Sequence, residues 1–117
     1  MSISTSTRRD LQPLVKGFGA KVFVLYVGRK RGKYGAHLEI AGLTKTADST
    51  IRAFCRLIKA LPEAERRLWN SATVRSFSIG IRAGTHPTPC DFTIQPGTIK
   101  AASEVAAQIV LTIYPPE

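Results

Sequence analysis

Residues 21–40 read KVFVLYVGRKRGKYGAHLEI, and this stretch decides the fold that we expect. Its first part, 21–28, is rich in β-branched and aromatic residues, a composition typical of strands. Its last part, 34–40, alternates apolar and polar residues, with Ala36 on one face and His37 on the other. Such alternation predicts a half-buried strand. The two runs therefore predict a β-hairpin whose turn carries the positive charges between them.

The turn of this hairpin, GRKRGKYG at 28–35, is the first candidate binding site. It contains Arg29, Lys30, Arg31 and Lys33, and Tyr34 follows directly. Lysine and arginine side chains bind phosphates or an acidic protein surface, and an exposed tyrosine can stack on bases. The alternative is a hairpin tip that only keeps the chain in solution.

Residues 46–61 predict a helix, because apolar residues recur there with a period of 3.6. Its opposite face carries Arg52, Arg56 and Lys59, which we take as a second group of candidate binding residues. An ordinary solvated helix face is the more common explanation of such a stripe.

The remaining pattern predicts the rest of an α+β domain. We expect a short helix after Pro62, strands at 73–84 and 91–95, a helix from Pro96 and a strand at 108–114. From residue 34 onward this order is the split βαβ pattern of the ferredoxin-like fold. We therefore predict a mostly antiparallel sheet with helices on one face and 21–28 as an extra N-terminal strand. The near-continuous apolar run at 108–114 predicts a central strand.

The chain length of 117 residues suits one domain, which we place at 20–117, with residues 1–19 as a flexible N-terminal tail. Strand 21–28 is apolar on both faces, so we expect it at a sheet edge, where it would form a homodimer. No apolar run is long enough for a signal sequence or a membrane span, and this predicts a cytoplasmic protein without a membrane partner.

The net charge of +9 lies entirely in residues 1–67, whereas residues 68–117 hold equal numbers of basic and acidic side chains. Such asymmetry predicts an acidic partner, either nucleic acid or an acidic protein surface.

Few residues point to chemistry. Only His37, His86, Cys55 and Cys90 could provide nitrogen or sulfur ligands, and their spacing does not suit a zinc site. No nucleophile motif, paired carboxylates or phosphate-binding glycine loop is present in the sequence. We therefore predict no enzyme, no metal, no cofactor and two reduced cysteines.

The C-terminal half contains IKALPEAERRLWNSATVRSFSIGIRAG, followed by FTIQPGTIKAASEVAAQIVLTIYPP. Over residues 50–115 the chain resembles the bacterial family catalogued as domain of unknown function 4279. The matching positions are Leu68, Trp69, 77–81, 96–99 and the TIY at 112–114. The resemblance implies no established activity. It implies an accessory protein of bacteria or phage, linked to toxin immunity or to phage–host conflict.

These observations lead to one functional hypothesis and one alternative. The hypothesis is a small basic binding protein that docks an acidic protein surface, as immunity or inhibitor proteins do. The alternative is a nucleic-acid-binding module that uses the same basic turn.

Overall fold

A computed structural model describes residues 2–5, 11–19, 22–30, 33–40, 46–82, 84 and 91–115. In these ranges strands and helices follow one another along the chain. The elements are β1 (Ser2–Thr5), α1 (Gln12–Phe18), β2 (Val22–Lys30), β3 (Lys33–Ile40), α2 (Ala47–Lys59), α3 (Glu63–Ser71), β4 (Val74–Arg82), α4 (Pro96–Glu104) and β5 (Gln108–Tyr114). Among the described helices, none combines the length and the apolar character that a membrane span requires.

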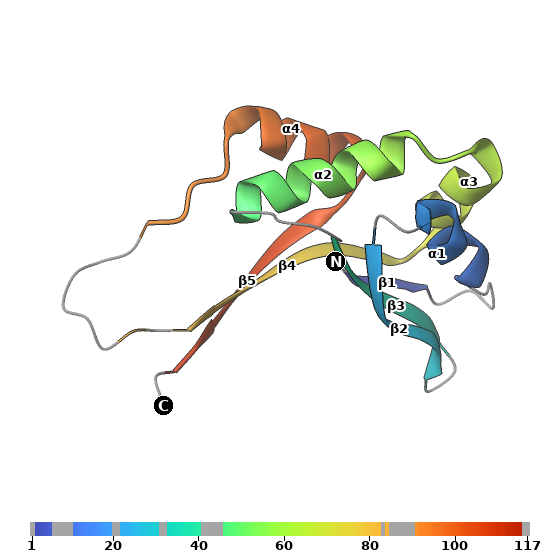
Figure 1. The fold of residues 1–117 in the computed structure, drawn as a ribbon, viewed down its shortest axis with the longest axis horizontal. Coiled ribbons are helices and arrows are strands. Elements are labelled where there is room, and N and C mark those ends of the chain that lie inside the picture. Colours follow the sequence, from blue (N-terminus) through green and yellow to red (C-terminus); the bar gives the residue numbers. More distant parts are fainter. Residues whose placement is uncertain are drawn as a thin grey trace.

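The described strands form one five-stranded sheet in the order β2-β3-β1-β4-β5. β1 lies in the centre and pairs antiparallel with β3 and with β4, and β2 pairs antiparallel with β3. β5 runs parallel to β4, and α4 lies in the connection between them. Figure 1 shows the helices together above the sheet. The predicted α+β class is therefore confirmed.

The ferredoxin-like strand order that the sequence predicted is not the order observed. Residues 91–95 form no strand, and Phe92, which we expected within it, is 54% exposed. The physical reason lies in β4, whose two edges are already occupied by β1 and β5. The predicted central position of residues 108–114 is also wrong, because β5 ends the described sheet.

We expected residues 1–19 to form a flexible tail, but the described part of this segment contains a strand and a helix. β1 pairs on both sides, with Ser2 opposite His37 of β3 and Ser76 of β4. α1 then buries an apolar stripe at helical spacing, formed by Leu11, Leu14, Val15 and Phe18. Backbone pairing explains β1, which has almost no apolar pattern of its own, and core packing explains α1.

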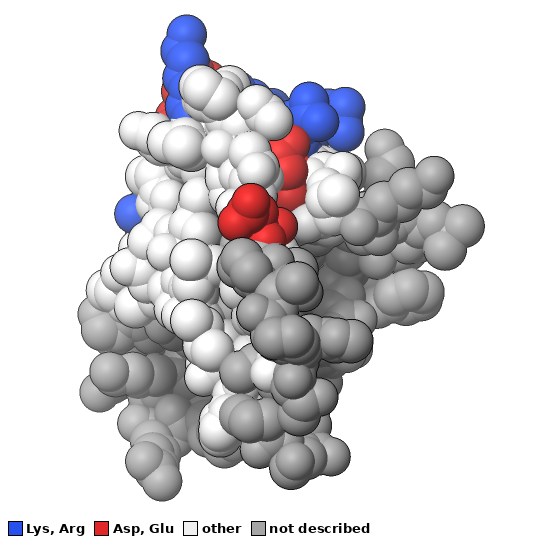
Figure 2. Space-filling view, turned by 90° about the vertical axis from the view of Figure 1, so that its left-hand side faces the viewer, with Lys and Arg blue, Asp and Glu red and all other residues white. Residues whose placement is uncertain are grey.

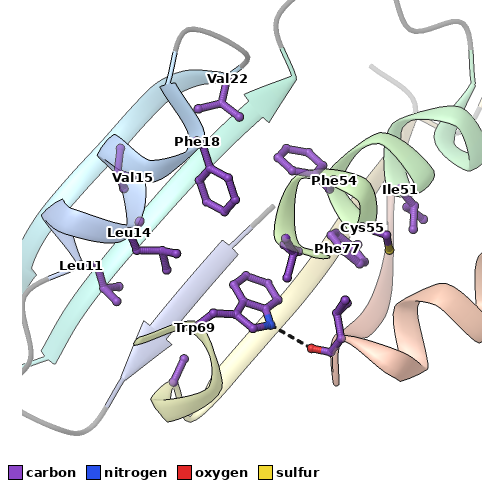
Figure 3. Packing of buried hydrophobic residues seen from close by; sticks show 14 of the residues in the cluster. Leu11, Leu14, Val15, Phe18, Val22, Ile51, Phe54, Cys55, Trp69 and Phe77 are labelled. Atoms are coloured by element: carbon purple, nitrogen blue, oxygen red, sulfur yellow. Dashed lines mark hydrogen bonds between the residues drawn. The ribbon is translucent and has the colours of Figure 1, made fainter. Parts of the chain in front are cut away.

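The core lies between the helices and the sheet (Figure 3). Trp69 of α3 is 0% exposed, and its indole Nε1 donates a hydrogen bond of 2.9 Å to the carbonyl oxygen of Val105. Phe54 of α2 stacks on Phe77 of β4 with ring centroids 6.0 Å apart. These contacts fix α2 and α3 on the sheet, and Trp69 also holds the end of α4.

α2 starts and runs as the sequence predicted. The Thr46 hydroxyl oxygen accepts a hydrogen bond of 3.0 Å from the Ser49 backbone N–H, which caps the helix. The apolar side chains at helical spacing face the core: Ile51, Phe54, Cys55 and Ile58. The opposite face is therefore the one that presents the basic side chains.

Candidate functional site

The basic hairpin forms as the sequence predicted. Arg29 of β2 lies opposite Tyr34 of β3, and Lys30 lies opposite Lys33 at the end of the ladder. The guanidinium carbon of Arg29 is 5.9 Å from the centroid of the Tyr34 ring, a distance suited to a cation–π contact. Tyr34 itself is half-buried and packs against the core. Arg31 lies outside the described residues.

Arg29 is exposed, and no carboxylate among the described side chains forms an ion pair with it. Tyr34 packs against the core, and its ring lies within cation–π distance of the Arg29 guanidinium, which favours positions of the guanidinium beside the ring. The hairpin therefore presents an exposed positive group that is available to a partner.

The second basic group lies on the exposed side of α2 and is partly neutralised. Arg52 Nε lies 3.2 Å from an oxygen of Asp48, and Lys59 Nζ lies 2.7 Å from an oxygen of Glu104. Arg56 lies between them and has no ion pair among the described residues. The three side chains line a shallow groove of about 140 Å³.

The two basic groups do not form one surface. In Figure 1, α2 lies at the top of the molecule, and the turn end of β2 and β3 points to the lower right. β2 is also one edge of the sheet, whereas α2 lies above the sheet and packs against α4. A partner that contacts the hairpin turn does not have to contact the α2 stripe.

Two carboxylates join α2 to α4, one near each end of α2. Asp48 accepts a hydrogen bond of 2.8 Å from the backbone N–H of Gln95, at the start of α4. This bond, the nearby Thr98 hydroxyl and the charge of Arg52 lower the pKa of Asp48, and burial opposes them. Among the described residues the Thr98 hydroxyl has no partner within hydrogen-bond distance.

At the other end of α2, the hydrogen bond and the charge of Lys59 lower the pKa of Glu104. Both carboxylates are therefore ionised at neutral pH and hold the two helices together. Burial raises the pKa of the Cys55 thiol, which keeps it protonated and unreactive.

The described residues offer little for metal or cofactor chemistry. Within these ranges no three His, Cys, Asp or Glu side chains lie close enough to hold a metal ion. His86 and Cys90, the one loose ligand pair in the sequence, fall outside the described residues.

A hollow at the start of α2 was not predicted from the sequence. It measures about 590 Å³ and is lined by Thr46, Ala47, Asp48, Thr50, Asp91, Phe92, Thr93 and Gln95. Figure 2 shows the end of the molecule where α2 and α4 begin, with basic side chains along the upper edge and acidic ones below. The hollow joins two segments far apart in the sequence, so no local pattern could reveal it. Its buried carboxylate, Asp48, is already bonded to Gln95 and Arg52.

Comparisons with models of known protein families, with curated proteins and with solved structures find no match for this chain. The resemblance of residues 50–115 to the bacterial family named above stays a prediction. The hairpin and the α2 stripe are therefore candidate binding surfaces on the strength of their geometry in this structure.

Proposed function

We propose that this chain is a non-enzymatic binding protein that docks an acidic protein surface through its basic hairpin. The contact residues are Arg29, Lys30, Arg31, Lys33 and Tyr34. The action is that of an immunity or inhibitor protein, in which opposite charges speed the encounter and fix the orientation of the partner.

The observation that carries this proposal is the Arg29–Tyr34 pair. Arg29 is exposed, lies 5.9 Å from the Tyr34 ring and has no ion pair among the described side chains. Arginine and tyrosine are among the residue types that most often dominate binding energy at protein interfaces. A pair held against the core loses little side-chain entropy on binding, which favours affinity.

The α2 stripe takes a secondary role in this proposal. Arg52 and Lys59 already have carboxylate partners, and breaking these pairs would offset part of the gain from a new partner. Arg56 is the member of the stripe that remains available to an acidic group. We therefore expect its contribution to be smaller than that of the hairpin.

The alternative function is nucleic-acid binding through the same hairpin. The cluster of four cations in 29–33 favours it, because each can neutralise one phosphate. Nucleic-acid binding with a steep salt dependence involves about 6–10 phosphate contacts. The hairpin provides fewer cations, and the α2 stripe lies apart from it (Figure 1). A compact acidic protein surface fits this small cluster better than a phosphate backbone does.

Two variants with equal charge test the proposal. The first replaces Arg29, Lys30 and Lys33 by serine, and the second replaces Lys16, Arg67 and Lys100, which are exposed on α1, α3 and α4. Each loses three of the chain's positive charges.

Both variants and the wild type are used to capture partners from extracts of the native host, with and without nuclease treatment. We expect an acidic protein that the wild type and the second variant retain and the first variant loses. If both variants retain the same proteins equally, hairpin docking is wrong. If nuclease removes every retained protein, the nucleic-acid alternative replaces it.

A further inference from the structure

β5 leaves an apolar surface in solvent that its sequence does not lead one to expect. Leu111 is 58% exposed and Ile113 is 68% exposed, and Val110 and Tyr114 are exposed as well. Leu111 and Ile113 lie on one face of the strand, and Val110 and Tyr114 lie on the other. Both faces of β5 therefore expose large apolar side chains, and exposed apolar surface that is contiguous often marks an interaction site.

The exposed surface continues the core of the molecule beyond its helices. In the parallel ladder Phe77 pairs with Ile109, Ile79 with Leu111, and Ile81 with Ile113. Side chains two residues apart lie on the same face of a strand. Phe77 stacks under Phe54 of α2, so this face is the one that the helices cover. Toward the end of β5 the helix cover ends, and the apolar ladder continues in solvent (Figure 1).

α4 and β5 also enclose a groove along this edge. The groove measures about 450 Å³, and its lining includes Ile99, Ala102, Ala106 and Ile109. Ile99 projects from α4 with 53% of its surface exposed. The edge of the sheet is therefore apolar on the helix side as well as along the strand.

β5 lacks the features that protect ordinary edge strands. Native edges carry lysine, proline or bulges that prevent pairing with another chain. β5 reads QIVLTIY, has no charged residue, and pairs with β4 in an unbroken register over seven residues. Among the described strands only β4 pairs with it, so its outer edge has backbone groups to offer to another strand.

We propose that β5 pairs with β5 of a second copy of this chain, antiparallel and about a two-fold axis at Leu111. This inference does not depend on the proposed function. Ile109 would then lie beside Ile113 of the other copy, and Leu111 beside Leu111, so that apolar side chains meet on the helix-covered face. The two sheets would join into one, as in β-strand addition.

Charge favours a second copy over an acidic partner at this edge. Residues 68–117 carry three basic and three acidic side chains and therefore no net charge. The basic hairpin lies at β2, the opposite edge of the sheet, so the positive charges of the two copies stay apart. The exposed Ile99 lies beside Ile109 in the groove at this edge and adds apolar surface to it, and a standard interface buries about 800 Å² per partner.

The sequence predicted a homodimer through 21–28, and β2 is indeed an edge strand. That edge ends in Arg29 and Lys30, whereas β5 is uncharged. The two edges thus give competing dimers that one experiment separates.

Sedimentation velocity from low to high micromolar concentration measures the oligomeric state of the wild type and of three variants. Leu111→Lys and Ile113→Lys place charge on β5, and Val74→Lys is the control on β4, where Val74 is also exposed. In the proposed dimer Leu111→Lys brings two ammonium groups together, which weakens dimerisation by at least about 100-fold. Far-UV circular dichroism confirms that each variant is folded.

We expect a dimer for the wild type and for Val74→Lys, and monomers for the two β5 variants. A wild type that stays monomeric at high micromolar concentration overturns the proposal. So does a dimer that survives both β5 substitutions. Amide hydrogen exchange of the wild type gives a test without variants, because protection of residues 109–114 must rise with protein concentration. Protection that rises in 22–28 instead assigns the dimer to β2.

Discussion

Replacing Trp69 by phenylalanine is expected to lower the free energy of unfolding by about 3 kcal/mol. Trp69 is fully buried, and its Nε1 donates a 2.9 Å hydrogen bond to the carbonyl oxygen of Val105. Loss of this donor leaves a buried carbonyl without its partner, which costs about 1–2 kcal/mol. The smaller ring leaves a void, which costs about as much again. Domains of this kind unfold with about 5–15 kcal/mol, so the loss is a large share.

Urea unfolding followed by far-UV circular dichroism measures this change, since the substitution removes the only tryptophan and its fluorescence. The control is Phe77→Leu, in the same core but without a polar partner, for which we expect a loss of about 1 kcal/mol. A Trp69→Phe variant no less stable than Phe77→Leu would refute the role assigned to the hydrogen bond between α3 and the end of α4.

Two further predictions concern stability. Because the pKa of Asp48 is lowered in the folded state, its stabilisation is present above its unfolded pKa of about 3.9 and is lost as the pH falls through the folded value. Asp48→Asn should therefore have a lower free energy of unfolding than the wild type at pH 7, and urea titrations should show this difference shrinking as the pH falls. A difference that stays constant with pH contradicts the link between the ionised Asp48 and Gln95. Gly97→Ala should raise the unfolding free energy by about 0.5–1 kcal/mol. Gly97 lies in α4, and a β-carbon there would meet no atom of the surrounding structure within 4 Å. Gly19→Ala should lower the unfolding free energy by about 1 kcal/mol, because Gly19 has a φ of +67°. Thermal melts in which both glycine variants gain stability, or both lose it, contradict this reasoning.

The sequence predicted those elements whose own residues carry a strong period. Residues 34–40 alternate clearly and form β3, and the apolar stripe at 46–61 forms α2. Arg29, Lys30 and Lys33 lie at the turn end of the hairpin because two well-patterned strands bring them there.

The elements that were missed depend on partners far away in the sequence. β1 reads SIST, which has too little apolar character to predict a strand, and it is held by β3 and β4 on its two sides. Residues 91–95 have strand-like composition, but they cannot pair with β4 as the predicted order requires, since β1 and β5 occupy both edges of β4. Pattern alone cannot show which edges are already taken.

For β5 the sequence predicted the strand itself but not its position in the sheet. Its apolar run is typical of a buried central strand, but the chain places it at the edge with Ile113 68% exposed. Disagreement between local pattern and position is expected at functional surfaces. The composition of β5 therefore fits a strand that a second copy covers.

The measurement that tests the central claim most directly is a salt titration of wild-type binding to short random-sequence duplex DNA and single-stranded RNA. Docking to an acidic protein surface predicts affinity no tighter than about 100 µM for either probe near physiological salt. Binding tighter than about 100 µM, with a log–log salt slope of about −3.6 on the duplex, that is lost when Arg29, Lys30 and Lys33 become serine would contradict the claim. The hairpin would then be a phosphate-binding element.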